Sequence, residues 1–229
     1  DRPGMFDVQL VPRHQGRGNI SSSESTAARS APGVIDIVTG ADLPSTNVPS
    51  PEKPLAIGRV FYVGQPVVAV IAESETAAAD AAALVDVDYE SLDVTVDPAA
   101  AMRDGAGRVL DAEEEADAAD ASMHGAGTDA EAGGAAPRKP SNVSSVVSLT
   151  RGDTEAALKS ADAVIKATYT LAGVHHSPLE PHVSMVRPEP DGGMTVCGPS
   201  RRPVPVHVEV GMGHGTPPPQ LRVVRAHVV

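Results

Sequence analysis

A strand, helix and strand pattern in the first half of the chain constrains its fold most strongly. Val67 to Ala72 is a continuous apolar run typical of a buried strand, and the alanine-rich stretch after it predicts a helix over residues 75–84. Ser74 can cap that helix through its hydroxyl group, and Glu75 places a negative charge in the first turn, where the helix dipole favours it. Val85 to Glu90 then alternates apolar and acidic residues, as a half-exposed strand does. This succession predicts an α+β domain.

Two more strands precede this pattern. Met5 to Val11 alternates well enough for one strand, and Val34 to Val38 is a second, shorter one. Between them, residues 13–18 form a polar, glycine-rich connector. The connector is not a phosphate-binding loop, because it lacks the Gly-Lys-Ser/Thr ending of such loops. We therefore expect residues 1–100 to form one domain.

Composition excludes several classes of function. The formal net charge of −12 argues against binding to nucleic acid or to anionic membrane surfaces, which both require basic patches. Aromatic residues make up only 2% of the chain, so its core must consist of valine, isoleucine, leucine and alanine.

The cysteine count and the hydropathy of the chain limit its possible disulfides, metal sites and cellular location. Cys197 is the only cysteine, so an intramolecular disulfide is impossible and the ligands of an iron–sulfur or structural zinc site are lacking. We expect this side chain to be a small, buried strand residue. No run approaches 18 apolar residues, and the N-terminus has no signal-peptide pattern. A soluble, cytoplasmic protein is the expectation.

An acidic segment separates the two halves of the chain. Residues 104–135 contain nine acidic residues against one basic residue, with little to bury beyond alanine, and this composition predicts a solvated, disordered insertion. We place the whole insertion or linker at residues 101–140. The segment over residues 143–149, which contains three valines and a leucine, then predicts a strand at the start of the second domain, residues 141–229.

The second half begins with a helix and a strand. Asp153 is a good N-cap for a short helix that ends near Ser160. Apolar and polar residues then alternate over residues 163–171, which predicts a strand. Further on, Pro190 to Gly193 is a strong hairpin signal between two strand-like runs. These runs are residues 183–187 and 194–197.

The stretch from His175 to His182 concentrates polar groups between these elements. Pro178 and Pro181 exclude a helix, so a stiff, extended loop is expected. One interpretation is that His176 and Glu180 are placed for function, and the other is that they are hydrogen-bonded parts of the scaffold. Metal binding by the three histidines is disfavoured, because no cysteine pair completes a tetrahedral site. The spacing alone does not decide between the two interpretations.

A series of motifs resembles a known enzyme family. The motifs of the second half are Arg151-Gly152-Asp153-Thr154-Glu155-Ala156-Ala157, Ala161-Asp162-Ala163-Val164, Tyr169 and His175 to Pro181. The motifs of the first half are Ser25 to Arg29, Pro32 to Val34, Val38 to Pro44, Val63 to Ala72 and Val87 to Glu90. In this order they resemble the large, molybdopterin-binding subunit of xanthine dehydrogenase/aldehyde oxidase-type molybdenum hydroxylases, in particular its carbon monoxide dehydrogenase-like members. The resemblance implies an α/β hammerhead-like domain followed by the start of the molybdenum-binding domain.

The resemblance also implies an activity and its components. The family hydroxylates aldehydes, N-heterocycles or carbon monoxide with oxygen from water, using a molybdenum–molybdopterin cofactor that we expect in its cytosine dinucleotide form. FAD-binding and 2Fe-2S subunits or domains are the implied partners, in a hetero-oligomer that dimerises. The family's catalytic base is expected beyond Val229, so no catalytic residue is assigned here. Since family subunits are several times longer, we expect this chain to be an internal segment that is inactive alone.

The end of the chain departs from the family pattern. Arg201 occupies the approximate place of a cofactor-facing glutamine, which makes it a candidate cofactor-binding residue by resemblance. His176 and Glu180 are the candidates for the substrate channel or for supporting the cofactor site. Prolines and glycines after residue 202 make the family's next helix improbable, whereas residues 218–224 resemble its next strand. Divergence or a damaged reading frame would both produce this pattern, so the alternative function is a truncated or decayed, non-catalytic homologue with a structural role.

Overall fold

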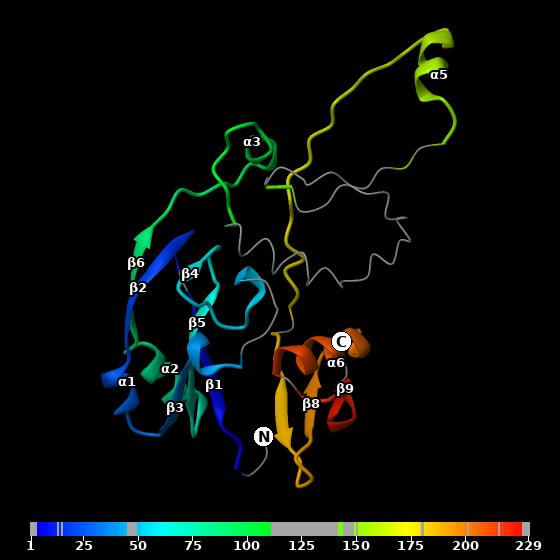
Figure 1. Ribbon diagram of the computed structural model, residues 1–229. Coiled ribbons are helices and arrows are strands. Elements are labelled where there is room, and N and C mark those ends of the chain that lie inside the picture. Colours follow the sequence, from blue (N-terminus) through cyan, green and yellow to red (C-terminus); the bar gives the residue numbers. More distant parts are fainter. Residues whose placement is uncertain are drawn as a thin grey trace.

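The computed structural model of the chain contains two folded parts joined by extended segments (Figure 1). It describes residues 4–12, 14, 16–44, 50–110, 142–143, 149, 151–179, 181–200, 202–214 and 216–225. The described residues form three sheets of three strands each. Two of these sheets belong to the first part, and the third belongs to the second part.

The first sheet has the predicted apolar run at its centre. The strand β5 (Pro66–Ala72) lies between β1 (Asp7–Pro12) and β3 (Val34–Thr39), and it pairs antiparallel with both. The helix α2 (Glu75–Ala82) packs against this sheet. All four elements were predicted from the sequence and are confirmed, with small differences at their ends.

The core of the first part lies where this sheet meets α2 and the second sheet. The buried cluster consists of small aliphatic residues, as expected from the lack of aromatic ones. Its members are Ala28, Ile37, Ala56, Val60, Val67, Val68, Val70 and Ala81. A buried polar residue, Gln65, lies beside them. Its Oε1 accepts a hydrogen bond of 2.8 Å from the Phe61 amide, so its burial is compensated.

The start of α2 is set by a side chain, as predicted. Ser74 is extended, and its hydroxyl oxygen accepts a hydrogen bond of 3.3 Å from the Ala77 amide. This bond satisfies one of the amides that have no partner within the helix itself. Alanine at five of the eight helical positions lets the helix approach the sheet closely, and Ala78 and Ala81 are buried there.

Replacing Ser74 with alanine is expected to lower the free energy of unfolding by about 1 kcal/mol, because the Ala77 amide loses its acceptor. Urea unfolding followed by circular dichroism measures the change. Ser74→Asp is the matched control, since aspartate keeps an acceptor at the same position and should stay near wild type. Equal losses in both variants would contradict the capping role.

The second sheet contains a strand that the sequence did not indicate. β2 (Gly18–Glu24) lies between β4 (Arg59–Val60) and β6 (Asp86–Ser91). Its serine-rich sequence has no strand pattern of its own, and only pairing with the predicted β6 makes it a strand. Side chains support this pairing, because the Ser22 hydroxyl donates a 2.9 Å hydrogen bond to the Asp88 carboxylate.

Short helical turns complete the first part. They are α1 (Thr26–Arg29), η1 (Gly40–Asp42), η2 (Ser50–Glu52) and α3 (Pro98–Ala101). Among the residues that the structure describes, no helix is long and apolar enough to cross a membrane.

The predicted acidic insertion begins later than its composition suggested. Residues 104–110 are described, and Ala106, Arg108, Val109 and Leu110 are half-buried, so this stretch belongs to the folded part. The expectation of a disordered segment from residue 104 is therefore wrong for these seven residues, because hydrogen bonds to other segments anchor them. Residues 111–135 lie outside the described residues, as do residues 144–148 of the predicted strand over 143–149.

The third sheet follows the predicted hairpin. β7 (Met185–Pro188) pairs antiparallel with β8 (Met194–Gly198), and the turn between them confirms the hairpin signal. β9 (Leu221–Arg225) lies where the sequence also predicted a strand, and it pairs parallel with β8. The turn η3 (Pro218–Gln220) leads into β9. Cys197 lies on β8, half-buried rather than fully buried.

A helix links the two parallel strands, and its existence corrects the sequence-based expectation. α6 (Pro203–His214) covers 12 residues despite Pro203, Pro205 and two glycines. Both prolines lie in the first turn, where amides have no partner within the helix, so little is lost there. Contacts with β9 compensate the low helix propensity of the glycines. Gly211 lies next to Leu221 of β9, and His207 Nε2 is 2.8 Å from the Leu221 carbonyl oxygen.

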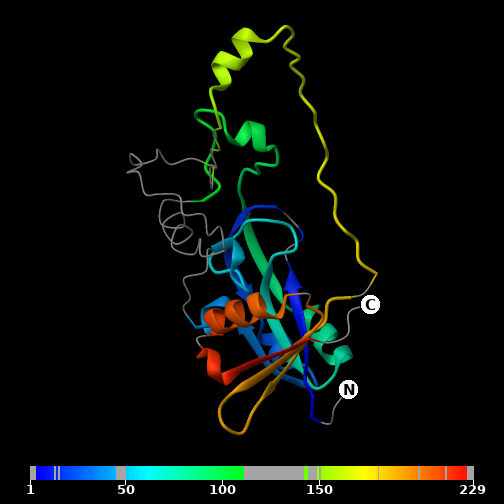
Figure 2. The same ribbon diagram turned by 90° about the vertical axis from the view of Figure 1, so that its right-hand side faces the viewer.

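The extended segment before β7 corrects a second expectation. Helix α5 (Thr154–Ser160) forms as predicted, with the Asp153 carboxylate accepting a 2.9 Å hydrogen bond from the Ala156 amide. The predicted strand over residues 163–171 is not formed. These residues are extended, but they pair with no strand in the described part of the chain, and α5 and this segment project away from the sheets (Figures 1 and 2). Alternation creates a strand only where a neighbour supplies the backbone hydrogen bonds.

Candidate functional site

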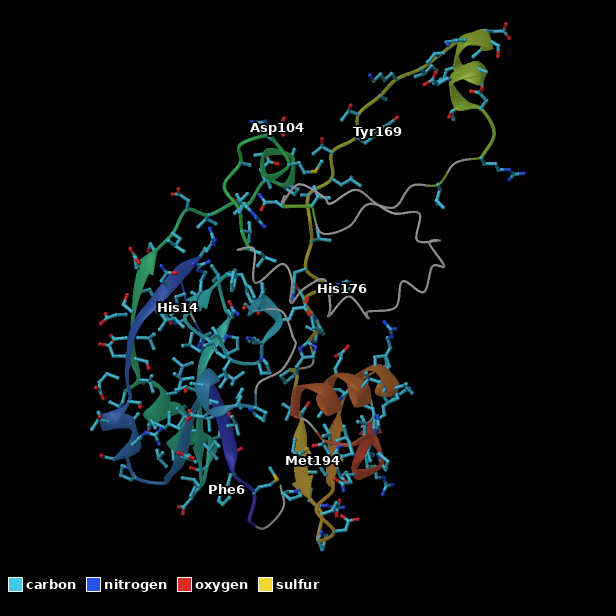
Figure 3. All side chains as sticks on the ribbon, in the orientation of Figure 1. Phe6, His14, Asp104, Tyr169, His176 and Met194 are labelled. Atoms are coloured by element: carbon cyan, nitrogen blue, oxygen red, sulfur yellow. The ribbon has the colours of Figure 1, made fainter. Side chains whose placement is uncertain are left out.

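The histidine loop is extended and open to solvent. His175, His176 and His182 are all exposed, and His176 lies on the extended trace between Tyr169 and the sheet that carries Met194 (Figure 3). His175 Nδ1 accepts a 2.9 Å hydrogen bond from the Ser177 amide, which fixes a tight local turn. The prediction of a loop without a helix is confirmed.

Ser177 has an unusual backbone conformation. Its φ is +46°, and among the described residues it alone combines a positive φ with a side chain. The following Pro178 disfavours the right-handed helical region for Ser177, and the bond to His175 holds the turn. Positive φ costs a non-glycine residue about 1–2 kcal/mol. The turn therefore marks a defined bend within the otherwise extended loop.

The residues between this loop and β7 lie next to the end of β8. β7 pairs with β8 so that Met185 lies opposite Cys197, which brings the residues before β7 next to those after β8. A Cβ atom on Gly198 would lie 2.8 Å from the Ser184 hydroxyl oxygen, so the two segments are in close contact. The candidate site is thus the end of the third sheet, where the residues that follow the histidine loop contact the end of β8 shortly before α6 begins.

Two of the predicted site residues cannot be placed at this end. Glu180 and Arg201 lie outside the described residues, so their roles stay predictions. Ser200, which was not selected from the sequence, makes two hydrogen bonds just after β8. Its hydroxyl oxygen accepts a 3.1 Å hydrogen bond from the Arg202 amide, and its own amide donates to the Gly198 carbonyl at 3.0 Å. No spacing signal in the sequence marks this serine.

The start of α6 is a weak place for an anion. A helix N-terminus attracts anions through its unpaired amides and the helix dipole. Here Pro203 and Pro205 have no amide hydrogen, and the Val206 amide already donates to the Arg202 carbonyl at 3.3 Å. Most of the donors that such a site uses are therefore missing.

The opposite end of the sheet is held by an ionic network. Glu189 Oε1 accepts hydrogen bonds of 2.6 Å from the Thr195 hydroxyl and 2.7 Å from Arg187 Nη2. These bonds, with the Thr195 hydroxyl first and the Arg187 guanidinium second, hold the pKa of Glu189 below its ordinary value of 4.5. The network stabilises the hairpin and lies away from the candidate site.

Because the pKa of Glu189 is lower in the folded chain, the carboxylate contributes stability above its ordinary pKa, and this is lost as pH falls through the lowered value. Thr195→Val is expected to raise the pKa of Glu189 toward the ordinary value. A pH titration of the Glu189 carboxyl carbon by NMR measures it. Thr168→Val, in the exposed segment, is the control. An unchanged Glu189 pKa in Thr195→Val would refute the assignment.

The described residues do not form a cofactor cradle by themselves. In the part of the chain that the structure describes, no three histidine, cysteine, aspartate or glutamate residues lie together as metal ligands would. His175, His176 and His182 of the loop are exposed, and Leu179 within it is fully exposed. This end of the third sheet therefore forms at most part of the boundary of a cofactor site.

Comparisons with known proteins agree with this architecture. Residues 2–93 match the family model of the aldehyde oxidase and xanthine dehydrogenase a/b hammerhead domain, and residues 135–228 match that of the molybdopterin cofactor-binding domain. The carbon monoxide dehydrogenase large chain of Afipia carboxidovorans is 30% identical over 97% of this chain and 27% of its own length. A probable xanthine dehydrogenase subunit of Bacillus subtilis is 28% identical over 85% of this chain and 23% of its own.

Solved structures give the same result. The Cu,Mo-CO dehydrogenase in its carbon monoxide reduced state matches all of this chain and 28% of its own, with 27% identity and a TM-score of 0.76. The chain belongs to the xanthine dehydrogenase and aldehyde oxidase family of molybdenum-dependent oxidoreductases. It combines the hammerhead domain with the start of the molybdopterin-binding domain, which confirms the predicted fold class. It spans about a quarter of the length of these relatives.

Proposed function

We propose that this chain acts as part of a molybdopterin-dependent hydroxylase that oxidises aldehydes, N-heterocycles or carbon monoxide with oxygen from water. The observation that carries the proposal is the order of the two family matches, which together extend over both halves of the chain. The contact of Ser184, just after the histidine loop, with Gly198 at the end of β8 supports it, because the resemblance to the family points to residues close in sequence to both. Residues 1–100, 101–140 and 141–229 are the proposed domains and linker.

The residues of this chain contribute support to the cofactor site rather than the chemical step. His176 and Glu180 line the approach to the site or brace it, and Glu180 ties the proline-stiffened loop to neighbouring backbone amides. Arg201 offers a guanidinium group that pairs with a phosphate of the cofactor, which we propose to be the cytosine dinucleotide form. The cofactor supplies the redox chemistry when bound.

Partners follow from the same family membership. The relative from Bacillus subtilis is by name a subunit, and the relative from Afipia carboxidovorans is by name a large chain. We therefore propose FAD-binding and 2Fe-2S subunits or domains as partners in a dimerised hetero-oligomer. A cytoplasmic location completes this proposal.

Expression of the chain in a host that makes the pterin cofactor tests whether the chain supports the cofactor site without carrying out the chemical step itself. We expect no stoichiometric molybdenum in the purified chain and no dye reduction with carbon monoxide or aldehydes. The full-length Afipia carboxidovorans large chain, expressed with its partner subunits in the same host, is the positive control. Bound molybdenum or turnover in the 229-residue chain would show that the segment forms the site without further sequence.

A truncated or decayed homologue without catalysis is the second candidate. The observation that favours it is the start of α6, where Pro203 and Pro205 remove the amides an anionic group would use, next to an arginine in place of the family's glutamine. The genomic sequence after Val229 separates the two candidates. A glycine-rich motif in frame supports the enzyme, whereas an early stop codon supports decay.

A further inference from the structure

The peptide group of Val109 is held from both sides by segments distant in the sequence. Its carbonyl oxygen accepts a 2.8 Å hydrogen bond from Arg17 Nη2. Its amide donates a 3.0 Å hydrogen bond to Asn142 Oδ1. Val109 is near the last described residue before the acidic segment, and Asn142 is the first described residue after it. The two ends of that segment therefore meet at one peptide group.

The side-chain amide of Asn142 makes three hydrogen bonds here. Besides accepting from Val109, its Nδ2 donates to the Gly107 carbonyl at 2.9 Å and to the Ala101 carbonyl at 3.1 Å. One acceptor and two donors on a planar amide match three backbone groups, one at the last residue of α3 and two in the stretch that follows it. Aspartate would keep only the acceptor, and alanine would keep none of the three bonds.

Arg17 connects the same point to the second sheet. It directly precedes β2, and its carbonyl oxygen accepts a 3.0 Å hydrogen bond from the Leu92 amide just after β6. Beside it, Gly16 lies so close to the Val94 side chain that a Cβ atom there would be 2.9 Å from Val94 Cγ2. The stretch that ends at Val109 is thus attached to the folded hammerhead domain.

We propose that Arg17, Val109 and Asn142 form a latch that holds the two ends of the acidic segment together. The latch determines, on the surface of the hammerhead domain, the point from which the molybdopterin-binding domain starts. Because the chain leaves and returns at the same place, the length of the segment between Val109 and Asn142 does not decide where the second domain begins. This inference is independent of the proposed function, since it concerns backbone connections alone.

Hydrogen exchange of individual amides tests the latch in the full chain. Asn142→Ala is expected to speed exchange of the Val109 amide about tenfold, the effect of losing one hydrogen bond to a half-buried group. Exchange of amides in β5 should stay at the wild-type rate. Asn142→Asp, which keeps the acceptor, should protect the Val109 amide better than Asn142→Ala. The control is Ser22→Ala, which removes an exposed hydrogen bond elsewhere on β2.

Shortening the loop provides the second arm of the test. A chain in which a short Gly/Ser linker replaces residues 111–141 should keep wild-type protection at Val109, and adding Asn142→Ala should remove it. The proposal is overturned if Asn142→Ala leaves Val109 protected, if it exposes β5 to the same degree, or if the shortened chain has already lost protection at Val109.

Discussion

Replacing Val70 with aspartate is expected to destabilise the hammerhead domain strongly. Val70 lies on the central strand of the first sheet, between Gln9 of β1 and Ile37 of β3, and its side chain is 0% exposed. A carboxylate there would have no partner to compensate its lost hydration, and such unpaired burial costs several kcal/mol, about 3–5 or more. Since a domain of this size is stable by only about 5–15 kcal/mol, this cost removes a large part of its stability.

Circular dichroism and thermal unfolding of the purified variant measure this effect. Val8→Asp is the matched control, because Val8 belongs to the same sheet but is 59% exposed on β1. We expect the control to melt within a few degrees of wild type. A Val70→Asp variant that melts cooperatively near the wild-type temperature would show that this core is not the one that stabilises the domain.

The second large effect is expected at Gly40, where the chain approaches itself closely. A Cβ atom there would lie 2.6 Å from Ile57 Cγ1 and 2.9 Å from the carbonyl oxygens of Leu55 and Ala56. The isoleucine end could move, but the two carbonyls belong to buried residues of the core. Gly40→Ala should therefore cost about 1–3 kcal/mol, the range of overpacked cores. For a domain of about 100 residues this lowers the melting temperature by several degrees per kcal/mol.

Gly173→Ala is the matched control for this substitution. A Cβ atom on Gly173 would meet nothing within 4 Å, and the residue lies in the exposed, extended segment. The same chemical change should then leave the melting temperature nearly unchanged. If Gly40→Ala melts no lower than Gly173→Ala, the close approach around Gly40 does not constrain the fold.

Much of the fold could be predicted because its signals are local. The cap at Ser74, the apolar run of β5 and the hairpin at Pro190 to Gly193 each depend on a few neighbouring residues. β2 had no such signal, since serine-rich residues form a strand there only through pairing with β6. α6 was judged improbable from its prolines and glycines, although proline is unfavourable only beyond the first turn and packing against β9 offsets the glycines.

The sequence predicted individual residues of the candidate site, but it did not predict where in the fold the site lies. The residue types of the histidine loop and the position of Arg201 were apparent from their resemblance to the family. The contact between the neighbouring segments depends on the register of β7 against β8, which brings Ser184 next to Gly198. Register follows from contacts across the whole sheet, so no single motif contains it. The same reason explains why Ser200 and the latch at Asn142 were missed.

The sequence by itself therefore determined the family, the order of the two domains and most of the elements with their caps and turns. These features depend on residue types and short spacings, which are written directly in the chain. The tertiary structure alone decided which segments are paired. It made β2 a strand and α6 a helix, while residues 163–171, with Ile165 93% exposed, remained unpaired. The physical reason is that a backbone hydrogen bond or an apolar contact gains free energy only when its partner is present, and distant segments meet only in the folded molecule.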